Sequence, residues 1–214
     1  GIDSLDLERI SADSATQRAG RAGRTAPGIA IRLWDERDRL RPHREAEIHI
    51  VDLAPALLDI LAWGGTPEQF EWFEAPSAEA VAAALSLLER LGALDAGRIT
   101  AEGHRMRRLP LHPRLARLLL DAGGARPALL ACALLSERAF LPPRREATDC
   151  DLLSAIQDPR ALPDHVRRTA RDLERTVSAL LGSPVPREID DAAFRRAVLA
   201  AYPDRVAQRR APPA

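Results

Sequence analysis

The sequence predicts a mostly α-helical protein with a small α/β segment in its first forty residues. Two β-like runs, residues 5–10 and 28–34, flank a stretch rich in small residues and arginine. Beyond residue 53, apolar side chains recur at helical spacing almost to residue 202. A tight hairpin pattern at residues 94–99 interrupts these helices. Together these features favour a helical protein over a sheet protein.

Composition narrows the class of protein. Hydrophobic residues make up 46% of the 214 positions, which is enough to bury a core, and 31 basic residues, all arginine, balance 31 acidic ones. A net charge of zero argues against a protein that coats nucleic acid by bulk electrostatics, but it leaves room for local patches. Without a long apolar run or a secretory leader pattern, we expect a soluble, cytoplasmic protein with no membrane contact.

The elements follow in order along the chain. A strand, a helix and a second strand are expected within residues 1–41, and an arginine-rich linker or surface loop within residues 35–47. Residues 42–110 then pattern as helix, helix, hairpin and helix, which is typical of a winged-helix unit. Residues 111–214 are expected to form a bundle of four or five helices, of which the longest covers residues 164–181.

Local signals set the bounds of the winged-helix elements. A helix over residues 53–63 ends at two glycines, and a short helix is expected to restart at Pro67. Ser77 is expected to cap a helix that Gly92 terminates, and Thr100 to cap a short helix through residue 108.

The segment QRAGRAGR, residues 17–24, carries the clearest chemical signal. On one helix, Gln17, Arg21 and Arg24 fall at positions i, i+4 and i+7 and share a face. Guanidinium groups fixed in this way stabilise the charge that develops as a γ-phosphoryl group is transferred. A merely solvated basic face is the alternative, and the glycines argue against it, because each costs about 1 kcal/mol relative to alanine inside a helix.

Residues 17–24 resemble motif VI of superfamily-2 helicases in its DEAH/RHA form. Residues 28–34 resemble the strand that follows motif VI in the second RecA-like domain. Six further segments resemble the bacterial HrpB-type branch of that family, so the resemblance covers nearly the whole chain: residues 53–55, 62–64, 88–94, 109–115, 134–138 and 201–210.

The resemblance implies a fold and a set of partners. Residues 1–41 would be the end of a second RecA-like domain, residues 42–110 a winged helix, and residues 111–214 a ratchet-like helical bundle. ATP with Mg2+ would be the cofactor, and single-stranded RNA would run through a channel that the accessory domains help to close.

It also implies roles for single residues. Gln17 would orient the attacking water or contact the γ-phosphate, and Arg21 and Arg24 would bind the phosphates, one of them as an arginine finger. Gly20 would allow close approach to the nucleotide.

A phosphate-binding loop and an acidic metal box do not occur in these residues. Both belong to the family's first RecA-like domain, which we expect in cis, so the fragment alone should not hydrolyse ATP. A free-standing winged-helix adaptor without ATPase activity is the alternative, and the reading frame upstream of Gly1 distinguishes the two.

Three other groups of residues have weaker signals. His104, His112 and His165 lack metal-ligand spacing, so we expect no metal site. The aromatic residues between positions 63 and 73 are expected in the core, with base stacking as the alternative. Finally, four arginines lie around residues 109–113: Arg105, Arg107, Arg108 and Arg114. For these arginines, contacts with an RNA backbone and exposure on a solvated face are equally favoured.

Overall fold

The computed structural model describes residues 9–35, 37–136 and 150–207. The chain forms two compact units: an N-terminal unit, residues 1–52 with 74–77, and a C-terminal unit, residues 53–73 with 78–214. The mostly helical fold class is confirmed. The expected boundaries between the three domains, at residues 41/42 and 110/111, stay a prediction. The two compact units are defined by internal contacts alone and do not test those boundaries.

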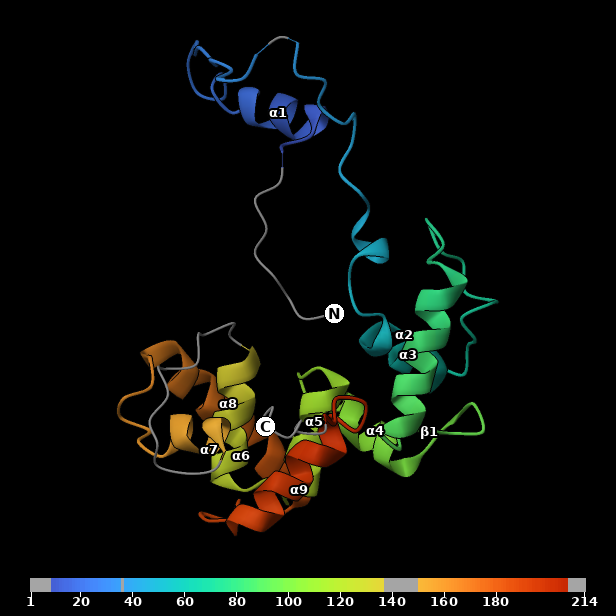
Figure 1. Cartoon of the computed structure of the whole chain (residues 1–214), viewed down its shortest axis with the longest axis vertical. Helices are drawn as coiled ribbons and strands as arrows, with labels where there is room; N and C mark the ends of the chain where they lie inside the picture. Colours follow the sequence, from blue (N-terminus) through green and yellow to red (C-terminus); the bar gives the residue numbers. More distant parts are fainter. Residues whose placement is uncertain (1–8, 36, 137–149, 208–214) are drawn as a thin grey trace, which may run out of the picture. The chain divides into compact units, whose positions relative to one another are not determined.

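The N-terminal unit is built around helix α1, Ala12–Ala19, with a short 3-10 helix η1 at Glu47–His49 (Figure 1). The first amides of a helix have no partner within it. Here the amide of Ala12 donates to the carbonyl of Arg41 at 2.9 Å, and that of Asp13 to the carbonyl of Pro42 at 3.1 Å. The arginine-rich segment therefore returns to the start of α1 and caps it.

The strand expected at residues 28–34 is absent: this segment is described and has no regular structure. Its alternating side chains Ile29, Ile31 and Leu33 are 88%, 79% and 91% exposed. A strand is stabilised by hydrogen bonds to a neighbouring strand, and no neighbour pairs with this segment among the described residues. The other expected strand, residues 5–10, lies mostly outside the described residues.

The C-terminal unit begins with the expected winged-helix elements. Helix α2, Ala54–Ala62, and helix α3, Ala78–Arg90, precede a hairpin of β1, Leu94–Asp95, and β2, Arg98–Ile99. Helix α4 follows at Ala101–Arg107. The cap predicted at Thr100 is confirmed, because its hydroxyl accepts a hydrogen bond from the amide of Gly103 at 3.0 Å.

The short helix predicted at Pro67 is wrong. Residues 67–69 form a turn, in which the amides of Gln69 and Phe70 both donate to the carbonyl of Thr66. One turn closes at this point, and the chain then runs without regular structure to α3.

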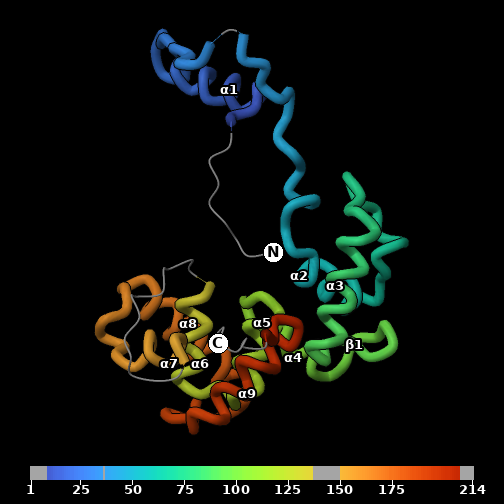
Figure 2. The backbone as a smooth tube through the Cα atoms, in the orientation of Figure 1, coloured from blue at the N-terminus to red at the C-terminus, as the bar shows by residue number. Residues whose placement is uncertain are grey.

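In its described residues the C-terminal unit continues with five helices: α5, Pro113–Asp121; α6, Arg126–Ser136; α7, Asp151–Ile156; α8, Asp164–Leu181; and α9, Asp191–Ala201. Helix α6 packs on α8, and α5 packs on α9 (Figure 2). The predicted apolar stripe of α8 is confirmed at its buried members Val166, Ala170, Leu173 and Val177.

Candidate functional site

Helix α1 carries only the first part of the QRAGRAGR motif. The helix ends at Ala19, and the amides of Arg21 and Ala22 donate to carbonyls three residues back, at 3.1 Å each. The prediction that one helix presents Gln17, Arg21 and Arg24 from a single face is therefore wrong. Glycine has low helix propensity, and the helix stops where the first glycine of the motif enters.

The three predicted site residues are nevertheless all accessible. Gln17 lies in the last turn of α1, Arg21 in the turn after it, and Arg24 beyond that turn, and each side chain is exposed. None of them is enclosed in the core of this chain. Their roles at a nucleotide stay predictions.

The two glycines of the motif have open space around them, whereas Gly28, which follows the motif, does not. A Cβ atom at Gly20 would lie 3.6 Å from the nearest atom, the carbonyl oxygen of Thr16, and one at Gly23 would have no atom within 4 Å. Packing among the described residues therefore requires neither glycine. A Cβ at Gly28, by contrast, would lie 1.8 Å from the carbonyl oxygen of Ala22. Gly28 thus lets the chain fold back against the motif, a role that the sequence pattern did not reveal.

Charges are arranged along α1 in the stabilising sense. The Ser11 hydroxyl and the Ser14 amide both donate to the Asp13 carboxylate, and these hydrogen bonds lower the pKa of Asp13. An anion at the start of a helix and a cation at its end both favour the helix dipole. Asp13 and Arg18 occupy these two ends.

The arginines predicted to touch RNA fall into different environments. Arg105 pairs with Glu102 at 3.0 Å within α4, and Arg107 pairs with Asp59 of α2 at 2.6 Å. Arg108, at the end of α4, is exposed. Exposed ion pairs of this kind rearrange at low cost, so Arg105 and Arg108 stay candidates for nucleic-acid contacts.

Arg114 is a structural residue. Its side chain is 10% exposed, and its guanidinium donates to both carboxylate oxygens of Asp204, at 2.6 and 2.7 Å, and to the carbonyl of Ala201 at 3.1 Å. The Arg114 hydrogen bonds lower the pKa of Asp204 to about 2. These contacts tie α5 to the end of α9 and argue against the predicted contact of Arg114 with nucleic acid.

The aromatic residues between positions 63 and 73 are not in the core, so that prediction is wrong. Trp63, Phe70 and Phe73 are 69%, 40% and 107% exposed. Trp72 donates its indole N–H to the carbonyl of Pro67 at 2.9 Å, and its ring meets that of Phe70 edge-on. The acidic residues of this loop, Glu68 and Glu71, disfavour a phosphate backbone beside the rings.

Other chemistry finds little support in the described part of the chain. It contains no cluster of three His, Cys, Asp or Glu residues that could hold a metal ion. Burial raises the pKa of the Cys132 thiol far above its usual range, which disfavours the nucleophilic thiolate. Within the same residues, no helix is both long and apolar enough to cross a membrane.

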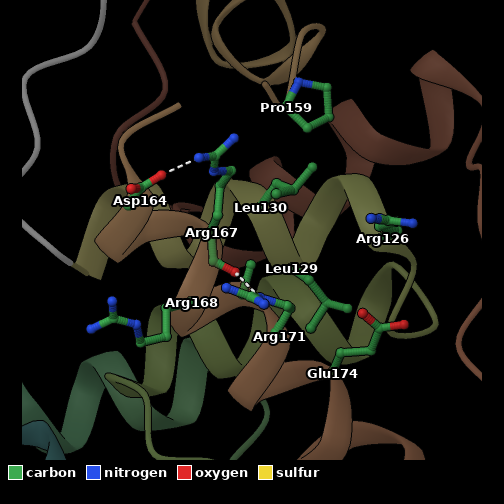
Figure 3. Close-up of a pocket in the computed structure, with 10 residues that line it drawn as sticks. Arg126, Leu129, Leu130, Pro159, Asp164, Arg167, Arg168, Arg171 and Glu174 are labelled. Atoms are coloured by element: carbon green, nitrogen blue, oxygen red, sulfur yellow. Dashed lines mark hydrogen bonds and ion pairs between the residues drawn. The ribbon is translucent and has the colours of Figure 1, made fainter. Parts of the chain in front are cut away.

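The structure also contains a cavity that the sequence did not reveal. It has a volume of about 490 Å³ and lies between α6, the segment around Pro159 and residues 164–174 of α8 (Figure 3). Four arginines line it: Arg126, Arg167, Arg168 and Arg171. Three of them sit within five residues of α8, which is the signal that could have drawn attention to this helix.

The similarity to known sequences agrees with the fold. The family described as helicase associated domain (HA2), winged-helix, matches residues 84–111. The ATP-dependent RNA helicase HrpB of Escherichia coli (strain K12) is 33% identical over 216 aligned positions, which cover 98% of this chain and 25% of that protein. The ATP-dependent RNA helicase HrpA of the same organism is 36% identical over 174 positions, which cover 76% of this chain and 12% of that protein.

Two solved structures of HrpB are also similar to this chain. A crystal structure of the Escherichia coli DEAH/RHA helicase HrpB matches with a TM-score of 0.73 at 30% identity, covering 95% of this chain and 25% of that chain. A second structure, of the E. coli DExH-box NTPase HrpB, matches with a TM-score of 0.70 at 33% identity. This chain thus spans about a quarter of HrpB's length. Over nearly all of its length this chain is therefore similar to a part of HrpB, a DEAH/RHA helicase.

Proposed function

We propose that this chain works as part of an ATP-dependent RNA helicase, to which it contributes motif VI and accessory nucleic-acid-binding elements. The observation that carries the proposal is the 33% identity to an RNA helicase across 98% of the chain. An accessible QRAGRAGR segment supports it. The same similarity favours the helicase over a free-standing winged-helix adaptor.

In this proposal the motif meets a nucleotide held by another domain. ATP with Mg2+ would be bound mainly by a RecA-like domain that carries the phosphate-binding loop, and Arg21 and Arg24 would approach the γ-phosphate from the other side. Gln17 would orient the attacking water. Gly20 supports this geometry, because it leaves the start of the turn without a side chain.

The remaining elements would handle RNA. Residues 42–110 and 111–214 would serve as the winged-helix and ratchet-like domains, and Arg105 and Arg108 would contact a phosphate backbone. Because phosphate contacts carry no sequence information, we expect little dependence on RNA sequence from these two residues.

The experiment uses the protein encoded by the complete reading frame around these residues. Arg21→Ala and Arg24→Ala are each expected to lower RNA-stimulated ATP hydrolysis by about 10³-fold, while binding of a fluorescent ATP analogue is largely kept. Arg39→Ala, an exposed arginine of the same unit outside the motif, is the control and should hydrolyse ATP normally. Near-normal turnover in both motif variants, or a complete frame without a phosphate-binding loop, would refute the proposal.

A further inference from the structure

The turn that carries the motif's arginines is fixed on one side by α1. The first amides of this helix donate to the carbonyls of Arg41 and Pro42, at 2.9 and 3.1 Å. Beyond its end, the amides of Arg21 and Ala22 donate to carbonyls three residues back, at 3.1 Å each. Arg21 therefore stands on a fixed base, whereas the backbone of Arg24 takes part in no hydrogen bond among the described residues.

A second contact closes the loop that carries Arg24. Ala22 and Gly28 are the two ends of this loop, and their backbones lie against each other. A Cβ atom at Gly28 would lie 1.8 Å from the carbonyl oxygen of Ala22 and 2.5 Å from its carbonyl carbon, so only glycine leaves room for this approach. The position of Arg24 therefore depends on how closely residue 28 approaches residue 22.

Gly28 is also the first residue of the segment at residues 28–34. In the proposed helicase this segment is a strand, and hydrogen bonds to neighbouring strands fix its place. The contact between Gly28 and Ala22 transmits that fixed place to the loop. Arg24 is then held between two anchors, the end of α1 and the start of the strand.

We propose that Gly28 is a positioning residue for ATP hydrolysis, which sets how far the guanidinium of Arg24 reaches toward the γ-phosphate. This inference rests on the proposed function, because it assigns Gly28 a part in the same reaction. Guanidinium groups stabilise the charge of a transferring phosphoryl group best when they are already in place. Gly28 has no side chain that could contact the nucleotide, and it acts through the backbone of Ala22.

Alanine at position 28 would displace the loop. Heavy atoms essentially never come within 3.0 Å of a Cβ, so the two backbones would have to separate by about 1 Å or more. A misplacement of about 1 Å at a reacting group costs about 10²-fold in rate. We therefore expect Gly28→Ala to lower kcat by about 10- to 100-fold. The KM for ATP should stay close to its wild-type value, because another domain provides most of the ATP-binding contacts.

The experiment measures ATP hydrolysis at saturating RNA, in the protein encoded by the complete reading frame. Gly103→Ala is the matched control, because its Cβ would also meet a carbonyl oxygen, that of Ala93 at 2.3 Å, but within the C-terminal unit. This control should keep a kcat near that of the wild type, at a temperature where circular dichroism shows both variants folded. Equal losses of kcat in the two variants would overturn the proposal, because they would show a general effect of a packing defect.

A double-mutant cycle identifies the group through which Gly28 acts. Arg24→Ala should lower kcat by about 10³-fold, and release of labelled phosphate from ATP can follow such slow rates. Adding Gly28→Ala to it should cause less than about a threefold further loss, because no guanidinium is left to misplace. If Gly28→Ala instead unfolded the motif, it would displace Gln17 and Arg21 too and cause its full loss in both backgrounds. Additive losses would therefore refute the inference.

The outcomes separate this inference from the proposed function. Impaired hydrolysis in Arg21→Ala and Arg24→Ala, together with a normal kcat in Gly28→Ala, would refute the inference and leave the helicase proposal standing. So would a raised KM for ATP at unchanged kcat in Gly28→Ala, since it would show a role in nucleotide binding. Normal turnover in both arginine variants would remove the helicase proposal and this inference together.

Discussion

The two units of the chain differ sharply in how much of themselves they bury. Among the described residues of the N-terminal unit, Ala15 is the one buried apolar side chain, while Ile29, Ile31 and Leu33 point into solvent. All other buried apolar side chains among the described residues belong to the C-terminal unit. Since burial of apolar surface is the main stabilising contribution to folding, the chemical motif lies in the unit that its own packing stabilises least.

This difference has a physical consequence for the motif. Regions with few buried apolar contacts open at low free energy. In the proposed helicase, neighbouring strands would cover the segment at residues 28–34 and hold the motif that precedes it.

The largest expected change in unfolding free energy comes from truncating a core residue, and truncation of an exposed residue serves as the comparison. Phe194 of α9 is fully buried, whereas Ile31 is 79% exposed. Phe194→Ala should lower the free energy of unfolding by about 3 to 5 kcal/mol, and Ile31→Ala should change it by less than about 0.5 kcal/mol. Urea unfolding followed by circular dichroism measures both.

Phe194→Leu guards against a variant that fails to fold, and its loss should be smaller than that of Phe194→Ala. A loss at Ile31 comparable to that at Phe194 would show that the N-terminal unit carries a core of its own and would break the comparison.

The next effect concerns the Arg114–Asp204 pair, which is more buried than the ion pairs described in the N-terminal unit. Arg114→Met should lower the free energy of unfolding by about 2 kcal/mol near neutral pH, as expected for paired hydrogen bonds between charged groups. Asp204 keeps some contact with water, since its side chain is 28% exposed, so the loss stays below that of a fully buried pair.

The pH dependence of this pair has a definite sign. Asp204 has a pKa of about 2 in the folded chain against 3.8 for the free group. A lowered pKa contributes stability above pH 4 that is lost as the pH falls toward 2. The difference in unfolding free energy between the wild type and Arg114→Met should therefore shrink between pH 5 and pH 2. A difference independent of pH would contradict the assigned role.

Apart from the short helix at Pro67, the helices of the C-terminal unit were predicted from the sequence because they are specified locally. The stripe on α8 and the cap at Thr100 need only neighbouring residues, and both are confirmed. The strand at residues 28–34 was predicted from the same kind of pattern and is absent, because a strand depends on a partner that local sequence does not contain.

The errors at the site have local causes too. Helical spacing placed Gln17, Arg21 and Arg24 on one face, but the helix stops before Gly20. Trp63 lies at the very end of α2 and Phe73 in a segment without regular structure. Both side chains are exposed, and helical periodicity does not predict orientation beyond a helix end. The cavity beside α8 joins residues from two helices and a loop, which only a folded chain brings together.

The smallest expected loss of unfolding free energy comes from replacing a glycine by alanine, and this substitution can be compared between the two units. At Gly103 in α4, a Cβ would lie 2.3 Å from the carbonyl oxygen of Ala93, and at Gly28 it would lie 1.8 Å from that of Ala22. Gly103→Ala should lower the free energy of unfolding by about 1 to 2 kcal/mol, because overpacking outweighs the gain in helix propensity.

Gly28→Ala creates the closer overlap, yet it should leave the main unfolding transition unchanged within about 0.5 kcal/mol, since the N-terminal unit adds little to that transition. Its effect should appear locally, as faster amide hydrogen exchange at residues 20–28. Equal losses of unfolding free energy in Gly28→Ala and Gly103→Ala would mean that the turn after α1 unfolds together with the core. In that case packing within this chain, rather than contacts from neighbouring strands, would hold Arg21 and Arg24 in place.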